Sequence, residues 1–280
     1  KDDLRSPVAV VKKYIGPDTP AAVKNAKIEY SDENAGFTVS WDAVSSEGVN
    51  GGYVDPAQTT YKVVRYPDEV TVAESASETT LFDAVAVPAD GMIQYYYTIA
   101  PTYAGETGES AKTNGVSLGM IVPPYEQPFS SADALSGYTI IKGSGFFNNE
   151  WVYRSGAVKG PKGSWLITPA MKLQGGYTYD ISFEMKSEYG YVEESMSIYL
   201  GTAPTADAMT TQVLESASVK STTFKPFNTT MTPATDGVYY IGFVCDSKSW
   251  NSAGVYMKNL TISAGQISGV ESVSTDGAPA

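Results

Sequence analysis

The sequence predicts an all-β protein built from two sandwich domains, and three observations support this prediction. Apolar and polar residues alternate with a period of two in many short runs, whereas the 3.6-residue period of an amphipathic helix is nearly absent. Turn residues separate these runs at short intervals. Tyrosine is the commonest aromatic residue, with 20 tyrosines against 9 phenylalanines and 4 tryptophans, and it suits a pleated, half-buried surface. The length of 280 residues fits two domains of ordinary size.

The composition excludes several classes of chemistry. The chain has no histidine and a single cysteine, Cys245. It therefore lacks a Ser-His-Asp or Cys-His nucleophile pair, the usual kinds of zinc site and any intrachain disulfide. The formal net charge of −12 predicts no nucleic-acid partner, because binding to phosphates requires clustered lysine and arginine. No apolar stretch has the length of a transmembrane segment.

Strands are predicted wherever the alternation persists. The clearest case is 179–186, where the odd-numbered residues are apolar and the even-numbered residues are polar. One face of this strand suits a core and the other suits water. Similar strands are predicted at 37–41, 95–99, 196–200 and 239–245. We interpret Cys245 as a small buried hydrophobe rather than a reactive thiol, because no basic residue adjoins it in sequence.

Turns and brief helical segments complete the local pattern. Asn50-Gly51, Asp90-Gly91 and Asp236-Gly237 are turn dipeptides whose residues tolerate a positive φ. Only 130–137 and 205–209 show even a short helical pattern.

Proline-containing segments at 15–20 and 120–124 mark the domain boundaries, because proline interrupts both helices and strand ladders. The predicted parts are an N-terminal strand or linker at 1–16, a first sandwich at 17–120, a second sandwich at 121–265 and a C-terminal linker at 266–280. We expect the piece at 6–16 to be the last strand of a missing preceding domain, and the C-terminal linker to continue further.

The first sandwich resembles a fibronectin type III domain. The segments that carry the resemblance are FTVSWDA with Trp41, TTYKVVRY with Tyr61, TTLFD around Leu81, and QYYYTIAPTYAGETGES. The resemblance implies an immunoglobulin-like sandwich in which one aromatic from each sheet meets at the centre, without a disulfide. The loop at 47–58 is longer than such connections usually are.

The second sandwich resembles the jelly-roll domains called choice-of-anchor J or cleaved-adhesin domains, which are found in secreted and surface proteins of Gram-negative anaerobes. The matching segments are PFSSADALSGYTII, GSWLITPAMKL with Trp165, TYDISFEMKS, ESMSIYLGTAP, GVYYIGFVCDS and VYMKNLTIS. The family often has an aspartate where this chain has Lys258, and an ammonium group cannot ligate a cation. The calcium site that related modules suggest therefore lacks one ligand here.

The carboxylates of the sequence support neither a metal site nor catalysis. No run of closely spaced carboxylates indicates calcium, so no cofactor is predicted. A calcium site assembled from distant loops stays open as an alternative. Adjacent pairs such as Glu193-Glu194 would point to opposite faces of a strand, and we interpret them as solvated. Glycoside hydrolysis needs two acids across a sugar. The candidates are Glu184, Glu188, Glu193 and Glu194, which lie on a polar strand face or in a polar loop. We predict that the protein is not an enzyme.

Aromatic residues in predicted loops are the candidate ligand contacts, because aromatic residues in strands are already explained by the core. A free ring can stack on the apolar face of a sugar while nearby polar groups orient its hydroxyls. The predicted ligand-binding residues are Trp151, Tyr153, Arg154, Tyr189, Tyr191, Trp250 and Asn251, with Asn148 and Asn149 as further polar neighbours. The alternative is that Trp151 seals one end of the jelly roll and that the tyrosines fill loops.

These observations predict a non-enzymatic adhesion or binding protein, secreted or at the surface of a Gram-negative bacterium and associated with its outer membrane. Its expected partner is a glycan or an extracellular protein. One alternative is a structural spacer within a larger surface protein, and another is an accessory domain of an exported hydrolase. The ligand, the anchoring mode and the oligomeric state are not predicted.

Overall fold

The computed structural model describes residues 14–143 and 149–267, and these residues are divided between two compact units. Of the described residues, the first unit comprises 14–87 and 94–116, and the second comprises 88–93, 117–143 and 149–267. Most of the strand predicted at 6–16, and the C-terminal linker after residue 267, lie outside the described residues.

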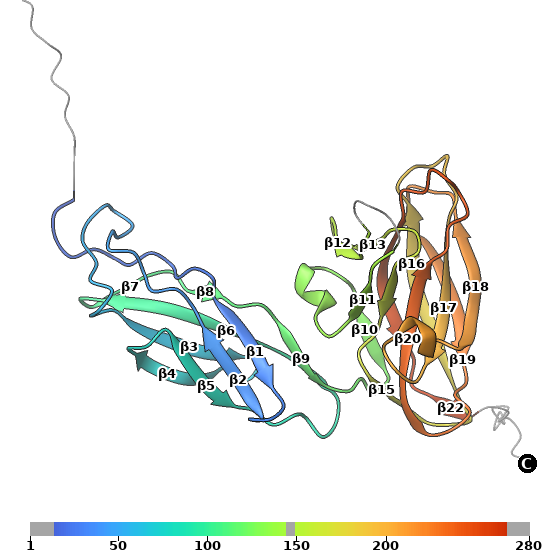
Figure 1. Cartoon of the computed structure of the whole chain (residues 1–280), viewed down its shortest axis with the longest axis horizontal. Coiled ribbons are helices and arrows are strands. Elements are labelled where there is room, and N and C mark those ends of the chain that lie inside the picture. Colours follow the sequence, from blue (N-terminus) through green and yellow to red (C-terminus); the bar gives the residue numbers. More distant parts are fainter. Residues whose placement is uncertain (1–13, 144–148, 268–280) are drawn as a thin grey trace, which may run out of the picture. The chain divides into compact units, whose positions relative to one another are not determined.

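The first unit is a sandwich of antiparallel strands (Figure 1). Its strands are β1 (Lys27–Ser31), β2 (Gly36–Ser40), β3 (Thr60–Tyr66), β4 (Val70–Ala76), β5 (Thr80–Ala84), β6 (Met92–Tyr103), β7 (Glu106–Thr107) and β8 (Ala111–Lys112). The first two residues of β6, and all but the first residue of β9 (Val116–Gly119), belong to the second unit. One sheet has the order β1-β2-β5, and the other has the order β4-β3-β6-β7, with β8 and β9 also paired to β6.

Aromatic side chains fill the space between these two sheets. Trp41 follows β2 and contacts Tyr61 of β3 edge to face, with 5.3 Å between the ring centroids. Phe37 and Tyr97 form a second such contact at 5.8 Å, and both are fully buried. Such pairs add stability beyond the area that they bury. The predicted meeting of one aromatic from each sheet is thus present.

The long loop at 47–58 is fixed by a buried carboxylate. Asp18 is 2% exposed and accepts hydrogen bonds from the backbone N–H groups of Asn50 and Gly52, at 2.8 and 2.9 Å. Burial alone would raise the pKa of Asp18, but the hydrogen bonds from Asn50, Gly52 and Thr19 outweigh it and lower the pKa below 3.8. Gly51 has a φ of 79°, which suits the predicted Asn50-Gly51 turn.

The second unit is a jelly-roll β-sandwich with two short 3₁₀ turns. Its elements are β10 (Tyr125–Gln127), η1 (Ala132–Leu135), β11 (Thr139–Ile141), β12 (Val152–Tyr153), β13 (Val158–Gly160), β14 (Trp165–Ile167), β15 (Met171–Leu173), β16 (Tyr177–Ser187), β17 (Glu194–Gly201), η2 (Ala206–Ala208), β18 (Thr211–Val219), β19 (Lys225–Met231), β20 (Gly237–Cys245), β21 (Val255–Ile262) and β22 (Gln266–Ile267). The two predicted helical segments are these 3₁₀ turns, whereas the predicted turn residue Gly237 instead begins β20.

Its two antiparallel sheets enclose one hydrophobic core. The first sheet has the order β12-β13-β21-β16-β19, with β10 paired to β21 and β22 paired to β16. The second has the order β11-β14-β20-β17-β18, with β15 paired to β20. The C-terminal linker was predicted to begin at residue 266, but Gln266 and Ile267 pair with Thr178 and Tyr177 as strand β22.

The predicted alternation of β16 is confirmed, because Tyr179, Ile181, Phe183 and Met185 are all buried. Cys245 is buried as expected, and burial raises the pKa of its thiol. Strand β17 departs from alternation, since both of its faces are covered. Its serines are therefore in the interior rather than in water.

No helix in the described part of the chain is long and apolar enough to cross a membrane.

Candidate functional site

One end of the second unit gathers the loops that hold most of the predicted ligand contacts (Figure 1). Strands β16, β18 and β20 end there, and β17, β19 and β21 begin there, as their registers require. The loop between β20 and β21, residues 246–254, is here named the Trp250 loop. The loop between β16 and β17, residues 188–193, lies at the same end and carries two tyrosines.

A buried glutamate holds one side of the Trp250 loop. Glu194, at the start of β17, has no exposed surface. It accepts hydrogen bonds from the backbone N–H groups of Ala253 and Gly254, at 2.8 and 3.2 Å. It also accepts bonds from the hydroxyls of Ser247 and Ser252, both at 2.5 Å. Four donors compensate for the lost hydration of the carboxylate. The prediction that Glu194 is solvated was wrong, because the loop folds over its strand.

A second carboxylate fixes the beginning of the same loop. Asp246 accepts hydrogen bonds from the hydroxyls of Ser195, Ser197 and Ser216, at 2.7, 2.5 and 3.2 Å. Its own N–H group donates to the carbonyl of Ser195 at 3.0 Å. Both ends of the Trp250 loop are therefore bound to the underlying sheet, and the residues between them form a supported tip.

Large aromatic rings are exposed at this end. Trp250, at the tip of its loop, is 95% exposed. Tyr189 and Tyr191 are 46% and 71% exposed, and their rings stack on each other at 5.4 Å with an interplanar angle of 17°. Exposed rings of this size are an apolar surface that a ligand can cover. Asn251, beside Trp250, accepts a hydrogen bond from the hydroxyl of Ser249, so it stabilises the tip.

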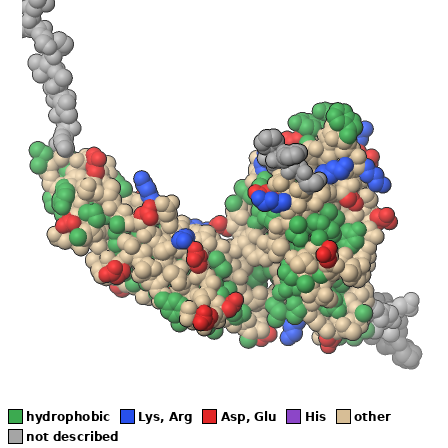
Figure 2. All heavy atoms as spheres, in the orientation of Figure 1, with side chains coloured by type: hydrophobic (Ala, Val, Ile, Leu, Met, Phe, Trp, Pro, Cys, Tyr) green, Lys and Arg blue, Asp and Glu red, His purple; other side chains and the backbone are tan. Residues whose placement is uncertain are grey.

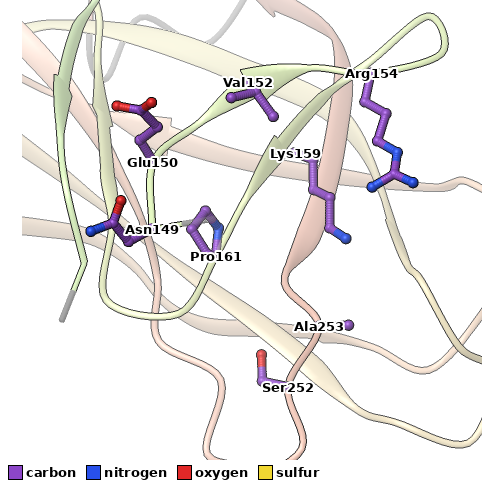
Figure 3. A pocket seen from close by; sticks show the side chains of 8 residues that line it. All are labelled: Asn149, Glu150, Val152, Arg154, Lys159, Pro161, Ser252 and Ala253. Carbon is purple, nitrogen blue, oxygen red and sulfur yellow. The ribbon is translucent and has the colours of Figure 1, made fainter. Parts of the chain in front are cut away.

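Two hollows flank the Trp250 loop. The first, named here the arginine hollow, has a volume of about 450 Å³ and is lined by Asn149, Glu150, Val152, Arg154, Lys159, Pro161, Ser252 and Ala253. Figure 3 shows the charged ends of Arg154 and Lys159 extending to the same side of it. The second, named the serine hollow, has a volume of about 600 Å³ and is lined by Tyr191, Glu193, Ser195, Ser216, Ser218, Lys220, Lys248 and Ser249.

A charged network holds Lys159, which is one of the residues that line the arginine hollow. Glu188 accepts hydrogen bonds from the ammonium group of Lys159 at 2.7 Å and from the hydroxyl of Tyr256 at 2.5 Å. The Lys159 bond, followed by the Tyr256 bond, lowers the pKa of Glu188. Burial, together with the Glu188 bond, raises the pKa of Tyr256 to about 12. Glu188 and Tyr256 therefore remain carboxylate and phenol at neutral pH.

Two predicted contacts are held within the fold instead. Trp151 is 1% exposed, and its indole N–H donates to the carbonyl of Ser164 at 3.2 Å. Its ring fills the space over Gly160, so it cannot contact a ligand, and the interpretation that it seals the jelly roll describes it better. Tyr153 of β12 donates from its hydroxyl to the carbonyl of Ser130 at 2.8 Å, which fixes the segment before η1 to this strand. Asn148 lies outside the described residues.

Two of the four predicted acid candidates, Glu184 and Glu188, have a lowered rather than a raised pKa. A glycosidase acid needs a raised pKa, but hydrogen bonds from Asn259 and Lys258 lower the pKa of Glu184, and that of Glu188 is lowered as well. Lys258, at the position where the resemblance suggests a calcium ligand, forms an ion pair with Glu184 at 3.3 Å. Among the described residues, no group of three or more acidic or cysteine side chains is placed to hold a metal ion.

Several residues of this site were missed in the sequence. Lys248 adjoins the Trp250 segment and could have been chosen from that position alone. Lys159 and Lys220 lie on or after strands of ordinary pattern, and only the fold brings them to the loop end. The sequence contained no sign that Glu194 is buried, because the pair Glu193-Glu194 reads the same whether one glutamate is buried or both are solvated.

Comparison with known proteins finds a fold likeness for the second unit. No family model and no curated protein matches the sequence. The C-terminal half is similar to the K1 cleaved adhesin domain of Lys-gingipain from Porphyromonas gingivalis W83, with 17% identity and a TM-score of 0.38. The alignment covers 51% of this chain and 98% of that domain.

Carbohydrate-binding jelly rolls are also similar in fold. The N-terminal cellulose-binding domain of β-1,4-glucanase C from Cellulomonas fimi is 17% identical, with a TM-score of 0.34, over 49% of this chain and 92% of that one. The xylan-binding CBM22-1 domain of Xyn10C from Paenibacillus barcinonensis is 9% identical, with a TM-score of 0.34, over 50% and 92%. At these scores the likeness says nothing about the ligand of this chain.

Proposed function

We propose that the protein is a non-catalytic binding protein that recognises a glycan or an extracellular protein through the loop end of its second unit. It acts outside the cell, secreted or at the outer-membrane surface of a Gram-negative bacterium. The first unit serves as a spacer of the fibronectin type III kind. Two features support that assignment, namely the β1-β2-β5 sheet packed on a second sheet and the contact between Trp41 and Tyr61.

The observation that carries the proposal is the full exposure of Trp250 on a loop whose two ends are fixed by carboxylates. An indole that is 95% exposed has no role in packing. The loop that presents it is nevertheless held by Glu194 and Asp246. A rigid support for an exposed ring lowers the entropy lost on binding. The stacked pair Tyr189 and Tyr191, which lies at the same loop end, adds a second apolar surface.

The alternative that the whole chain is a structural spacer gives the exposed loop aromatics no role. That alternative would be favoured if the loop aromatics were buried or if no hollow lay beside them. Instead Tyr191, Tyr189 and Trp250 are exposed, and Tyr191 lines the serine hollow. The binding role therefore has the better support.

The test is a binding screen with two paired variants. The chain is applied to an array of glycans and extracellular-matrix proteins, with and without a chelator. We expect Trp250→Ala combined with Tyr191→Ala to abolish retention. The melting temperature should hardly change, since exposed substitutions usually alter stability by less than about 0.5 kcal/mol. The control is Phe82→Ala, which removes a 51% exposed ring from the first unit. Retention that survives in the double variant rules out this site.

A further inference from the structure

Cationic side chains gather at the loop end of the second unit, although the chain as a whole is acidic. The formal net charge is −12, yet both hollows beside the Trp250 loop are lined by cations. Arg154 and Lys159 line the arginine hollow, and Lys220 and Lys248 line the serine hollow. Figure 2 shows blue side chains gathered at this end of the second unit.

Three of these four cations form no ion pair with a described residue, although the charge of Arg154 helps to lower the pKa of Glu188. Lys159 forms an ion pair with Glu188 at 2.7 Å. Within 14–143 and 149–267, by contrast, the side chains of Arg154, Lys220 and Lys248 form no ion pair or hydrogen bond. Lys258 and Lys142 of the same unit form ion pairs with Glu184 and Glu150, whereas Lys162, Lys172 and Lys225 form none with a described residue. Arg154, Lys220 and Lys248 are thus cations without an ion pair that line the hollows at the end carrying the exposed rings.

The aromatic residues at this end divide into two groups. The ring of Tyr256 is covered by the ammonium groups of Lys159 and Lys186, at 5.2 and 4.8 Å from its centroid, so it cannot stack on a ligand. The rings of Tyr191 and Trp250 are exposed. The surface therefore offers exposed flat apolar rings together with unpaired cations on both sides of one loop.

We propose that the ligand is an anionic saccharide, a sugar chain carrying carboxylate or sulfate groups, with Arg154 binding one such group and Lys220 and Lys248 another. This inference rests on the proposed function and names the ligand class of the same site. Guanidinium binds carboxylate and sulfate groups through paired hydrogen bonds, which a neutral sugar cannot accept in the same way. The Debye length in physiological salt is about 8 Å, so the net negative charge of distant surfaces is screened while these cations act locally.

The experiment measures Kd for pairs of polymers that share a backbone and differ in charge. Polygalacturonate is compared with its methyl ester for the carboxylate arm, and dextran sulfate with dextran for the sulfate arm. We expect the charged member of at least one pair to bind more tightly than its neutral partner, and its binding to weaken as salt is added. We expect Arg154→Gln combined with Lys248→Gln to weaken that binding at least about tenfold.

The control variant removes the same charge elsewhere. Lys24→Gln combined with Lys172→Gln also lowers the positive charge by two, and both lysines are exposed outside the loop end. This variant should bind as the unaltered chain does. Equal loss in both variants overturns the proposal, because net charge alone would then explain binding. Poly-L-glutamate bound as tightly as polygalacturonate overturns the saccharide class and indicates an acidic peptide.

The experiment distinguishes an error in the proposed ligand class, an anionic saccharide, from an error in the proposed binding site. Equal binding of charged and neutral polymers, with loss in Trp250→Ala combined with Tyr191→Ala, overturns the anionic class and leaves the proposed function standing. Binding that none of these variants alters overturns both. Absence of binding to either anionic polymer overturns the anionic class, and the array screen then decides whether the site binds anything.

Discussion

At the scale of single residues, Glu194 shows how a charge can be placed inside this sandwich without a cation beside it. Its carboxylate has exchanged water for two hydroxyls and two backbone N–H groups. Each of those donors is itself buried or half-buried, so each would be left without an acceptor if the carboxylate were removed. Glu194 therefore acts on function through the conformation of the Trp250 loop rather than by touching a ligand.

Replacing Glu194 by alanine should therefore be costly. We expect Glu194→Ala to lower the free energy of unfolding by roughly 2–4 kcal/mol, because several buried donors lose their acceptor together. Urea denaturation followed by tryptophan fluorescence measures the change. The matched control is Glu193→Ala at the neighbouring, exposed position, which should change stability by less than about 0.5 kcal/mol. Equal effects in the two variants would contradict the structural role of Glu194.

At the scale of elements, the alternation in the sequence predicted the strands that face a core on one side only. Strand β16 is such a strand, and its apolar face was predicted residue by residue. Strand β17 is covered on both faces, and its serines are buried with Asp246 of the Trp250 loop as their acceptor. A pattern in one segment contains no information about a partner supplied by another, so neither the buried polar layer nor the buried Glu194 could be predicted.

The same limit applied to the candidate site. The exposed rings of Tyr191 and Trp250 were predicted because they lie in polar segments that no strand pattern explains. Trp151 lies in an equally polar segment, but its ring packs over Gly160 of β13. Whether a loop aromatic points inward or outward depends on the small residue that receives it, and that residue is identified only by the register of β13 against β12 and β21.

Gly160 should therefore tolerate no side chain. An added Cβ would overlap the indole of Trp151, so we expect Gly160→Ala to destabilise the second unit by about 1–3 kcal/mol. The comparison variant is Gly190→Ala, where the nearest side-chain atom lies 3.8 Å from the added carbon and a change within about 0.5 kcal/mol is expected. Thermal unfolding of both variants measures the difference. A stable Gly160→Ala protein would show that the tryptophan is not packed as described.

At the scale of the whole molecule, the two units have separate hydrophobic cores, and all the candidate contacts belong to the second. Changes confined to the first unit should therefore alter stability without altering recognition. Asp18 is suited to this comparison, because it fixes the long loop of the first unit and its pKa is lowered in the folded state.

Because folding lowers the pKa of Asp18, the sign of the pH dependence of the first unit's stability can be stated. A carboxyl group whose pKa is lower when folded contributes stability above its unfolded pKa, and this stability is lost as the pH falls through the folded pKa. We expect the first unit to lose this contribution below about pH 4. The Asp18→Asn variant should lack this stabilisation already at pH 7, and its stability should fall less steeply as the pH is lowered. Urea midpoints between pH 2.5 and 7 measure this, with the exposed Asp32→Asn as control.

Ligand retention by Asp18→Asn at pH 7 completes the comparison, and it should equal that of the unaltered chain. Reduced retention would mean that the first unit takes part in recognition and is more than a spacer.

The attachment of the Trp250 loop at both ends has a consequence for engineering. The anchoring contacts involve Asp246 and Ser247 on one side and 252–254 on the other, which leaves 248–251 free to vary. A library randomised at those four positions should keep folding while its members acquire new specificities. The jelly roll would then serve as a display framework, in the way that antibody domains present their hypervariable segments.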